Sequence, residues 1–268
     1  MRFDCWESEE RGFGVRKILM AFVVCVVFVA GIAAGQSQKL DIDRLKTIAE
    51  RFDFLFILEG VGDKQTRIIY ADAREHVHVY RLEGDRTVVD WEATGLGSRA
   101  SALIVKDTDA DGREEIVIAT AGGRMVFYDA ETYELIWENL DTPFENIACL
   151  VAENIDGDPQ DELIFIADSH LHIYDSLSKS KEWESQREFD AREIVLGNVD
   201  DDDQLEIILN SGIVFDTRFY NVELEAEVSF GEKISLMDVN GDQIPEVIGE
   251  TGDYTIRIFD LYAERELW

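Results

Sequence analysis

Short runs of apolar residues, four to seven long, recur from Phe54 onward and alternate with short polar turns. They are rich in β-branched residues and lack the 3.6-residue apolar period of an amphipathic helix, so they predict β-strands. One stretch shows the order clearly, with predicted strands at 102–106, 115–119, 125–128 and 134–137. The chain from residue 54 is therefore predicted to be all-β and built from units of four short strands.

One pattern occurs four times, an acidic loop that runs directly into a β-branched strand. The copies are DTDADGREEIVI at 107–118, NIDGDPQDELIF at 154–165, NVDDDDQLEIIL at 198–209 and DVNGDQIPEVIG at 238–249. An eroded fifth copy, EGVGDKQTRIIY, lies at 59–70, and successive copies start 48, 47, 44 and 40 residues apart. This spacing is expected when a supersecondary unit of about four strands is repeated.

Aromatic residues recur in register within these units. The third strand carries an aromatic residue in all five, and the fourth carries a tryptophan in four: Tyr80, Tyr128, Tyr174, Phe215 and Phe259; Trp91, Trp137, Trp183 and Trp268. A four-stranded sheet buries both faces only by packing on the next sheet, which is the arrangement of a β-propeller. Residues 54–268 are therefore predicted to form a propeller of five four-stranded blades. Closure into a ring is expected, with the first and last blades in contact; the alternative is an arc whose edges another chain would shield.

The amino-terminal part carries features of export. Arg16 and Lys17 precede an uninterrupted apolar run at 18–34, and small residues stand at the −3 and −1 positions before Gln36. Residues 1–35 are therefore predicted to be a signal peptide, or a signal anchor if they stay uncleaved, with cleavage favoured. Either outcome makes the repeats extracytoplasmic: secreted, periplasmic or at the cell surface, with membrane contact only through 18–34 if uncleaved. Residues 36–53 are predicted to be a linker with a short helix.

Charge and cysteine content exclude two classes of protein. The chain has 25 Lys and Arg against 57 Asp and Glu, a formal net charge of −32, so a nucleic acid is not an expected partner. Of Cys5, Cys25 and Cys149, only Cys149 lies in the repeats, which excludes a disulfide framework there. Its apolar neighbours predict a buried free thiol.

The acidic loops have the chemistry of a cation site. Oxygen-bearing residues occupy loop positions 1, 3 and 5 and a glutamate occupies position 9, and Ca²⁺ takes six to eight oxygen ligands. Glycines beside the third ligand, at 112, 157 and 241, are expected to adopt positive φ. The candidate ligands are Asp107, Asp109, Asp111, Arg113 through its carbonyl, and Glu115; Asn154, Asp156, Asp158 and Glu162; Asn198, Asp200, Asp202 and Glu206; and Asp238, Asn240, Asp242 and Glu246.

The first copy departs from this pattern. Glu59, Val61 and Asp63 hold positions 1, 3 and 5, and Arg67 replaces the glutamate. A guanidinium there can pair with Asp63 and do without metal, so this blade is predicted to bind no cation.

The loops resemble the DxDxDGxxDL motif of FG-GAP and VCBS repeats, the calcium-bearing blades of integrin α-chain propellers and many secreted proteins. The resemblance implies Ca²⁺ between the first two strands of a blade and a propeller that serves as an adhesion or interaction platform. This chain has glutamate in place of aspartate at position 9 and lacks the phenylalanyl-glycine and glycine-alanine-proline signatures. The longer side chain can reach the metal or can hydrogen-bond the loop's own amides.

Two other groups of residues could take part in metal binding or catalysis. His76 with His78, and His170 with His172, form HxH pairs at equivalent places on two third strands. Alternate strand residues share a face and can chelate a transition metal, but two ligands make a poor site, which favours surface or inter-blade histidines. The many carboxylates also fit the acid pair of a glycosidase, although the loops already account for the repeated ones.

The favoured function is therefore a non-enzymatic, exported, calcium-binding propeller that binds a protein or a glycan. One alternative is a five-bladed glycan hydrolase or lyase, which requires acids that converge on the propeller axis. The other is a membrane-anchored structural subunit of an envelope assembly.

Overall fold

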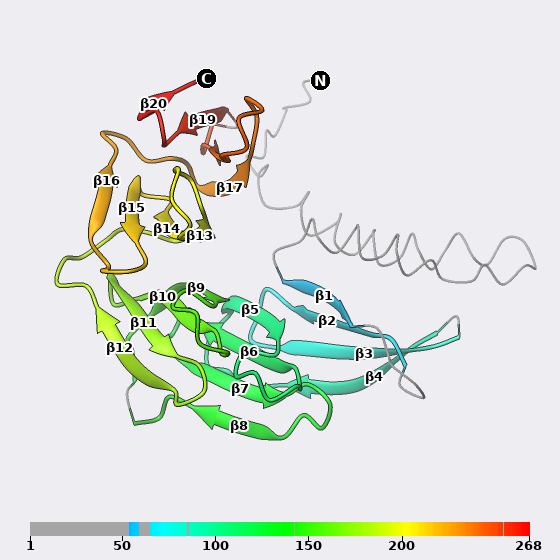
Figure 1. Cartoon of the computed structure of the whole chain (residues 1–268). Helices are drawn as coiled ribbons and strands as arrows, with labels where there is room; N and C mark the ends of the chain where they lie inside the picture. The colour runs from blue at the N-terminus through cyan, green and yellow to red at the C-terminus, as the bar shows by residue number, and fades with distance from the viewer. Residues whose placement is uncertain (1–53, 59–64, 85, 142, 254) are drawn as a thin grey trace, which may run out of the picture.

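The structure, a computed structural model, describes residues 54–58, 65–84, 86–141, 143–253 and 255–268. These residues hold twenty β-strands in five four-stranded antiparallel sheets and contain no helix (Figure 1). The all-β prediction and the number of blades are confirmed. The helix expected within 36–53 and the apolar segment at 18–34 lie outside the described residues. Within the described ranges, nothing helical has the length and apolar character to cross a membrane.

The strands of each blade pair in chain order. Blade 1 comprises β1 (Leu55–Leu58), β2 (Arg67–Ala71), β3 (Val77–Glu83) and β4 (Arg86–Ala93). Blade 2 comprises β5 (Ala100–Lys106), β6 (Glu115–Thr120), β7 (Met125–Asp129) and β8 (Leu135–Glu138). Blade 3 comprises β9 (Ile147–Glu153), β10 (Glu162–Ala167), β11 (His170–Asp175) and β12 (Ser180–Glu184). Blade 4 comprises β13 (Ile194–Gly197), β14 (Glu206–Leu209), β15 (Ile213–Asp216) and β16 (Val222–Glu225). Blade 5 comprises β17 (Lys233–Met237), β18 (Glu246–Glu250), β19 (Ile256–Asp260) and β20 (Arg265–Glu266).

The core lies between the blades, in four apolar clusters that each span one junction between consecutive blades. Strand β6 shows how the sequence produces this packing, because all six of its residues are buried. Ile116 and Ile118 join the cluster that contains Ile69 of blade 1, and Val117 joins the cluster that contains Leu163 of blade 3. Side chains alternate between the two faces of a strand, so a continuous apolar run covers both neighbouring blades.

The recurring aromatic residues strengthen these junctions. The ring of Tyr128 in blade 2 lies 4.7 Å from that of Trp91 in blade 1, and the ring of Phe215 in blade 4 lies 6.1 Å from that of Trp183 in blade 3. Such edge-to-face pairs add to the apolar burial. Trp268 follows β20 and its carbonyl accepts the N–H of Ile258 in β19 at 2.6 Å, but its side chain is 74% exposed, so it does not pack as the other recurring tryptophans do.

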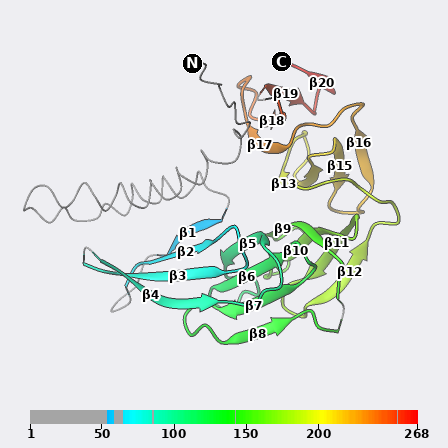
Figure 2. The same ribbon diagram turned by 180° about the vertical axis from the view of Figure 1, so that it is seen from behind.

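The described blades form an arc rather than a closed ring (Figures 1 and 2). Packing joins blades that are consecutive in the chain, and the two views place blades 1 and 5 at the two ends of the arc. In blade 5, at one end of the arc, Ile256 is 50% exposed. The expected contact between the first and last blades is therefore not made by the described residues.

Candidate cation sites in the blade loops

The acidic loops occupy one equivalent place in each blade, the connection between its first and second strands. The glutamate at position 9 is the first residue of the second strand, and in four blades it is almost completely buried. The exposed fractions are 2% for Glu115, 0% for Glu162, 2% for Glu206 and 2% for Glu246. A buried carboxylate needs donors or a cation to compensate for its lost hydration.

One oxygen of each buried glutamate fastens its own loop. The Oε2 atom accepts a hydrogen bond from the backbone N–H at loop position 2. The donors are Thr108 at 2.8 Å, Ile155 at 2.8 Å, Val199 at 2.8 Å and Val239 at 2.7 Å. The glutamate that replaces the expected aspartate therefore does hydrogen-bond the loop amide, and in blades 2 to 4 its other oxygen is available for a further contact.

Blade 2 gathers four carboxylates, from Asp107, Asp109, Asp111 and Glu115, and one oxygen of each lies within 4.8 Å of the others. The backbone N–H of Gly112 donates to Asp107 Oδ2 at 3.0 Å, whereas the buried Asp107 Oδ1 has no hydrogen-bond partner. Buried polar atoms without a partner are uncommon in native proteins and call for an unseen ion or water. This set is referred to below as the blade-2 cluster.

Blades 3 and 4 repeat the arrangement with three carboxylates each, within the same 4.8 Å limit: Asp156, Asp158 and Glu162 in the blade-3 cluster, and Asp200, Asp202 and Glu206 in the blade-4 cluster. The buried Glu162 Oε1 has no hydrogen-bond partner. Burial, together with the nearby aspartates of its own cluster, raises the pKa of Glu162 to about 7, and the same causes raise the pKa of Glu206 to about 7. The negative charge of each cluster is therefore poorly compensated by the protein.

The predicted asparagine ligands make local contacts as well. Asn154 and Asn198 donate through Nδ2 to the backbone carbonyls of Asp158 and Asp202, four residues later. Asn154 Oδ1 accepts the N–H of Gly157 at 2.9 Å. These side chains hold the loop in its turn, and their assignment as metal ligands stays a prediction.

The blade 5 loop has a different interior. Asn240 Nδ2 donates to Asp242 Oδ2 at 2.9 Å and also to Glu246 Oε1. Asp238 accepts hydrogen bonds from the backbone N–H groups of Gly241 at 2.6 Å and Gln243 at 3.0 Å. Among the described residues, the three carboxylates of this loop do not form a group within 4.8 Å. Hydrogen bonds satisfy them instead.

Loop curvature follows the sequence prediction. Gly112, Gly157 and Gly241 have φ values of 89°, 86° and 85°, and no atom outside their chain neighbours lies within 4 Å of a Cβ built on any of them. The left-handed backbone, not a lack of space, therefore explains glycine at these positions.

In blade 1, Arg67 stands at loop position 9, where the other blades have glutamate. Arg67 Nη1 donates to the backbone carbonyl of Ala130 and to the hydroxyl of Tyr133 at 3.1 Å, and both of these partners lie in blade 2. Asp63, its expected partner, and positions 1 and 3 of this loop lie outside the described residues.

A second repeated acid escaped the sequence prediction. The third strand of blades 2 to 5 ends on an aspartate that follows the aromatic residue, and this aspartate accepts hydrogen bonds from the next turn's N–H groups. The residues are Asp129, Asp175, Asp216 and Asp260. Asp129 lies directly across from Glu115 in the sheet, and Asp175 lies across from Glu162. The signal was present in the sequence as an aromatic–aspartate pair at each strand end.

In blades 2 to 4, the turn that this aspartate caps brings one side chain near the acidic loop, or the start of the second strand, of the preceding blade. The residue four positions after each of these aspartates has a positive φ. The values are 60° for Tyr133, 56° for Lys179, 54° for Tyr220 and 50° for Glu264. Tyr133 contacts Arg67 as described, and the positive charge of Lys179 acts on Asp109 and Glu115 of the blade-2 cluster. Burial lowers the pKa of the Lys179 ammonium, and these carboxylates oppose that shift. The loop of one blade is thus influenced by the turn of the next.

The donor sets fit a hard divalent cation. All the clustered atoms are carboxylate oxygens on a turn, the ligand type that Ca²⁺ prefers, and the partnerless Asp107 Oδ1 and Glu162 Oε1 belong to residues at ligand positions 1 and 9. In blades 2 to 4 the structure brings the predicted carboxylates together, and their role as metal ligands stays a prediction.

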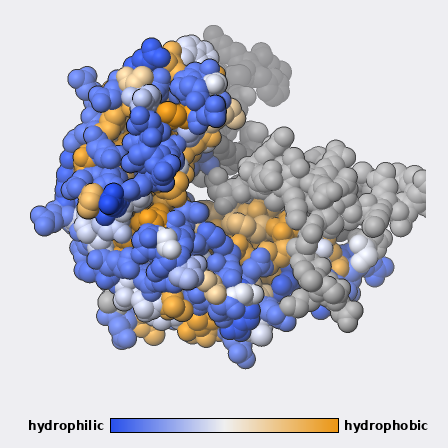
Figure 3. All heavy atoms as spheres, viewed as in Figure 1, coloured by the Kyte–Doolittle hydropathy of each residue, from blue (hydrophilic) through white to orange (hydrophobic). Residues whose placement is uncertain are grey.

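A cavity of about 880 Å³ opens on the inner side of the arc, where apolar side chains gather (Figure 3). The inner strands of blades 2 to 4 line it, with the acids Glu153, Glu193 and Glu232 at its wall. Among the described residues, these three acids do not form a group within 4.8 Å. Cys149 lines the same cavity as a buried free thiol, as the sequence predicts, and burial raises its pKa to about 12.

No family model and no curated protein matches this sequence. Solved structures match it over most of its length. BBS1N in complex with ARL6DN aligns at 13% identity and a TM-score of 0.57 over 88% of this chain and 69% of that one. The fold is that of a β-propeller. The V. cholerae biofilm matrix protein Bap1 aligns at 17% identity and a TM-score of 0.56 over 80% of this chain and 38% of that one. Saccharomyces cerevisiae Sqt1 aligns at 13% identity and a TM-score of 0.54 over 80% and 61%.

Proposed function

We propose that this protein is a non-enzymatic β-propeller whose loops bind Ca²⁺ and which serves as a protein-binding scaffold outside the cytoplasm. The observation that carries the cation assignment is the recurrence of carboxylate clusters at one place in blades 2, 3 and 4. An unsatisfied buried acceptor costs about 1–3 kcal/mol, and more when it is charged. A bound cation would offset that cost at Asp107 and Glu162.

Each cluster residue has a defined part in this proposal. The aspartates at positions 3 and 5 supply oxygens from the outer side of the turn, and the glutamate supplies one oxygen from the first residue of the second strand. Because its other oxygen holds the amide at position 2, the glutamate connects the cation to the loop backbone. Ca²⁺ itself would supply charge compensation and a link between the two ends of the loop.

The proposed role of the cations is structural. In blade 2, the carbonyl of Thr108 accepts hydrogen bonds from the N–H of Asp161 at 2.8 Å and the hydroxyl of Ser176 at 2.5 Å, both in blade 3. A rigid loop therefore supports the junction with the next blade. This arrangement favours a structural role for the cation, as support for the packing of two blades.

A protein is the proposed partner class. BBS1N, which shares the fold, is described in complex with ARL6DN. The acidic surface of this chain, with a formal net charge of −32, would favour a partner with a basic face through electrostatic steering. Location outside the cytoplasm, where Ca²⁺ is abundant, is proposed from the apolar segment at 18–34 and the small residues that follow it.

Calorimetric titration with Ca²⁺ tests the proposal. We expect saturable heat in the parent protein, and loss of one binding event in each of the variants Asp109→Asn, Asp156→Asn and Asp200→Asn. Asp190→Asn is the matched control, because the Asp190 side chain is 95% exposed and lies outside the loops. Absence of heat in the parent, or titrations of the three loop variants that match the parent, would refute the calcium assignment.

A further inference from the structure

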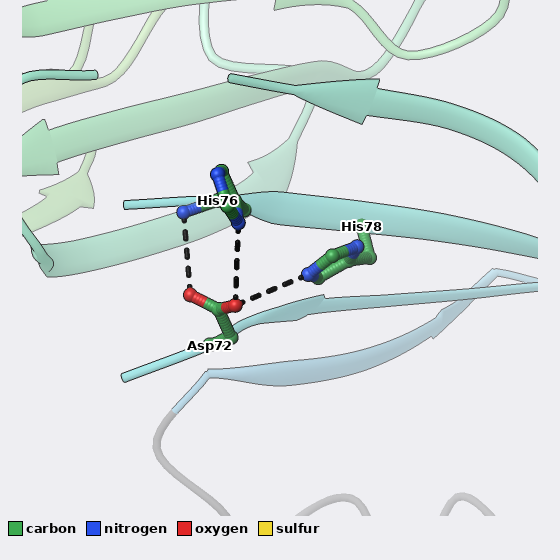
Figure 4. A group of neighbouring side chains, drawn as sticks. All are labelled: Asp72, His76 and His78. Carbon is green, nitrogen blue, oxygen red and sulfur yellow. Dashed lines mark hydrogen bonds and ion pairs between the residues drawn. The ribbon is translucent and has the colours of Figure 1, made fainter. Parts of the chain in front are cut away.

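A cluster of a different composition lies in blade 1, where β2 turns into β3. Asp72, His76 and His78 each direct one ligand atom to a common point, and the three atoms lie within 4.8 Å of one another (Figure 4). Asp72 Oδ2 is 3.4 Å from His78 Nε2 and 3.5 Å from His76 Nδ1. This cluster is separate from the acidic loops and combines two imidazoles with one carboxylate.

These separations match a tetrahedral metal site. When metal–nitrogen and metal–oxygen bonds are about 2.0–2.1 Å, two ligand atoms on a tetrahedron lie about 3.3–3.4 Å apart. The two separations from Asp72 Oδ2 differ from that value by 0.2 Å or less. The two separations from the carboxylate therefore suit an ion of zinc size.

The carboxylate is fixed by the hairpin before any ion arrives. Asp72 Oδ1 accepts hydrogen bonds from the backbone N–H groups of Arg74 at 2.8 Å and His76 at 3.3 Å. The Asp72 N–H in turn donates to the His76 carbonyl at 3.0 Å. With Oδ1 held in this way, Oδ2 is the oxygen that faces both imidazoles. Such preorganisation lowers the entropic cost of binding an ion.

His78 is also oriented from its other side. Glu92 Oε1 lies 3.5 Å from His78 Nδ1, the nitrogen that does not face Asp72, and the Tyr70 ring stacks on the imidazole with centroids 4.9 Å apart. Tyr70, His78 and Glu92 are directly opposite one another across β2, β3 and β4. A carboxylate on the second nitrogen is the usual support of a metal-binding histidine, because it fixes the tautomer that directs the other nitrogen to the ion.

The second HxH pair provides an internal comparison. His170 Nδ1 lies 2.9 Å from the carbonyl oxygen of Asp168, and His172 Nε2 lies 3.2 Å from that of Ala167. His172 is only 5% exposed, and among the described residues neither member of this pair belongs to a group of metal-ligand atoms. The histidines of the HxH motif therefore contact backbone carbonyls in blade 3, whereas in blade 1 they face the carboxylate of Asp72.

We propose that Asp72, His76 and His78 bind a divalent transition-metal ion of the zinc class, with Glu92 as the positioning residue of His78. Three protein ligands leave the fourth tetrahedral position for water or another donor. The side chains are 26%, 34% and 16% exposed, so an ion reaches the site from solvent. Two nitrogen donors distinguish this site from the oxygen-only loops, because imidazole favours zinc, copper, nickel or cobalt over Ca²⁺.

The test is Co²⁺ and Zn²⁺ titration of the purified protein in saturating Ca²⁺, which keeps the acidic loops occupied. We expect one equivalent of Co²⁺ with the visible absorption of tetrahedral coordination, displaced by Zn²⁺. His76→Gln and His78→Gln should abolish this spectrum, and His170→Gln is the matched control that should retain it. Glu92→Gln should weaken binding about 10–100-fold while keeping the spectrum.

Three results would overturn the proposal. One is the absence of a stoichiometric Co²⁺ or Zn²⁺ complex in the parent protein. Another is a spectrum that persists unchanged in both histidine variants, which would place the ion elsewhere. The third is equal loss in His170→Gln, which would point to a general effect on folding. The Glu92 side chain is 39% exposed, so its variant reports on the site even if a ligand variant folds poorly.

Discussion

Glu162 Oε2 accepts the backbone N–H of Ile155 at 2.8 Å, and the partnerless Oε1 of the same carboxylate belongs to the blade-3 cluster. One side chain thus joins the loop backbone to the candidate cation site. Substitution can separate these two roles. Binding a cation needs the negative charge of the carboxylate, whereas accepting the Ile155 N–H does not.

Glu162→Gln should keep the loop but lose the cation. The amide oxygen can still accept the Ile155 N–H, while the amide nitrogen replaces the anionic Oε1. We expect thermal stability without Ca²⁺ to equal or exceed that of the parent, and the stabilisation by Ca²⁺ to shrink. Glu162→Ala should also destabilise the calcium-free protein, by about 1–3 kcal/mol, because the half-buried N–H of Ile155 loses its acceptor. Equal calcium-free stability of the two variants in chemical denaturation would contradict this assignment.

Lys179→Met should raise the Ca²⁺ affinity of the blade-2 cluster. The Lys179 ammonium acts on Asp109 and Glu115 and competes electrostatically with a bound cation. Removal of about 1 kcal/mol of repulsion corresponds to about a fivefold gain in affinity. Lys181→Met is the matched control, because the Lys181 side chain is 50% exposed and paired with Glu184. Calorimetry that finds equal affinities for the two variants would argue against this electrostatic coupling.

His172→Phe should flatten the loss of stability at mildly acid pH. Burial lowers the pKa of His172; its environment also includes Glu184, Lys181, His170 and the carbonyl of Ala167. Because the folded protein binds a proton at this site less readily than the unfolded chain does, this histidine makes stability fall as pH drops below about 6.5. The slope from this group is at most about 1.4 kcal/mol per pH unit.

The phenylalanine variant removes the pH-dependent contribution of His172 to the unfolding free energy and keeps an aromatic ring beside Phe144 and Phe165. Unfolding free energies at pH 7 and pH 5 in the two proteins measure the difference directly. The raised pKa values of Glu162 and Glu206 act in the opposite direction in both proteins and cancel in that comparison. Parallel pH profiles would show that His172 does not titrate differently in the folded state.

Export should leave a mature chain that begins at Gln36. Small residues stand at the −3 and −1 positions before it, as a signal peptidase site requires. Amino-terminal sequencing of protein produced with its own leader and recovered outside the cytoplasm measures this. Recovery of the chain with residues 18–34 intact in the membrane fraction would favour the anchored alternative.

The sequence was most informative where the chain repeats itself. Position 9 glutamates such as Glu115 were predictable because each one follows a fixed loop and opens a buried strand. The cluster formed by Asp72, His76 and His78 was not, since the HxH pair alone offered two ligands. The third ligand comes from a carboxylate that the hairpin of β2 and β3 folds back onto the pair.

Contacts between blades were also beyond sequence reasoning. Arg67 was expected to meet Asp63 of its own loop, yet its described contacts are with Ala130 and Tyr133 of the next blade. The spacing of residues along the chain predicts the acidic loop itself. Which turn of the next blade contacts that loop depends on how the two sheets pack. Trp268 shows the same limit, because its place in the repeat suggested burial that only a further packed sheet would provide.

The melting temperature in Ca²⁺ and in chelator tests the central claim most directly. Each occupied site should add about 2.7 kcal/mol to the unfolding free energy when Ca²⁺ exceeds its Kd a hundredfold. We expect a clear rise in melting temperature with Ca²⁺ that is reversed by chelator and reduced when Asp109, Asp156 and Asp200 are all changed to asparagine. A melting temperature that neither Ca²⁺ nor chelator moves would contradict the account.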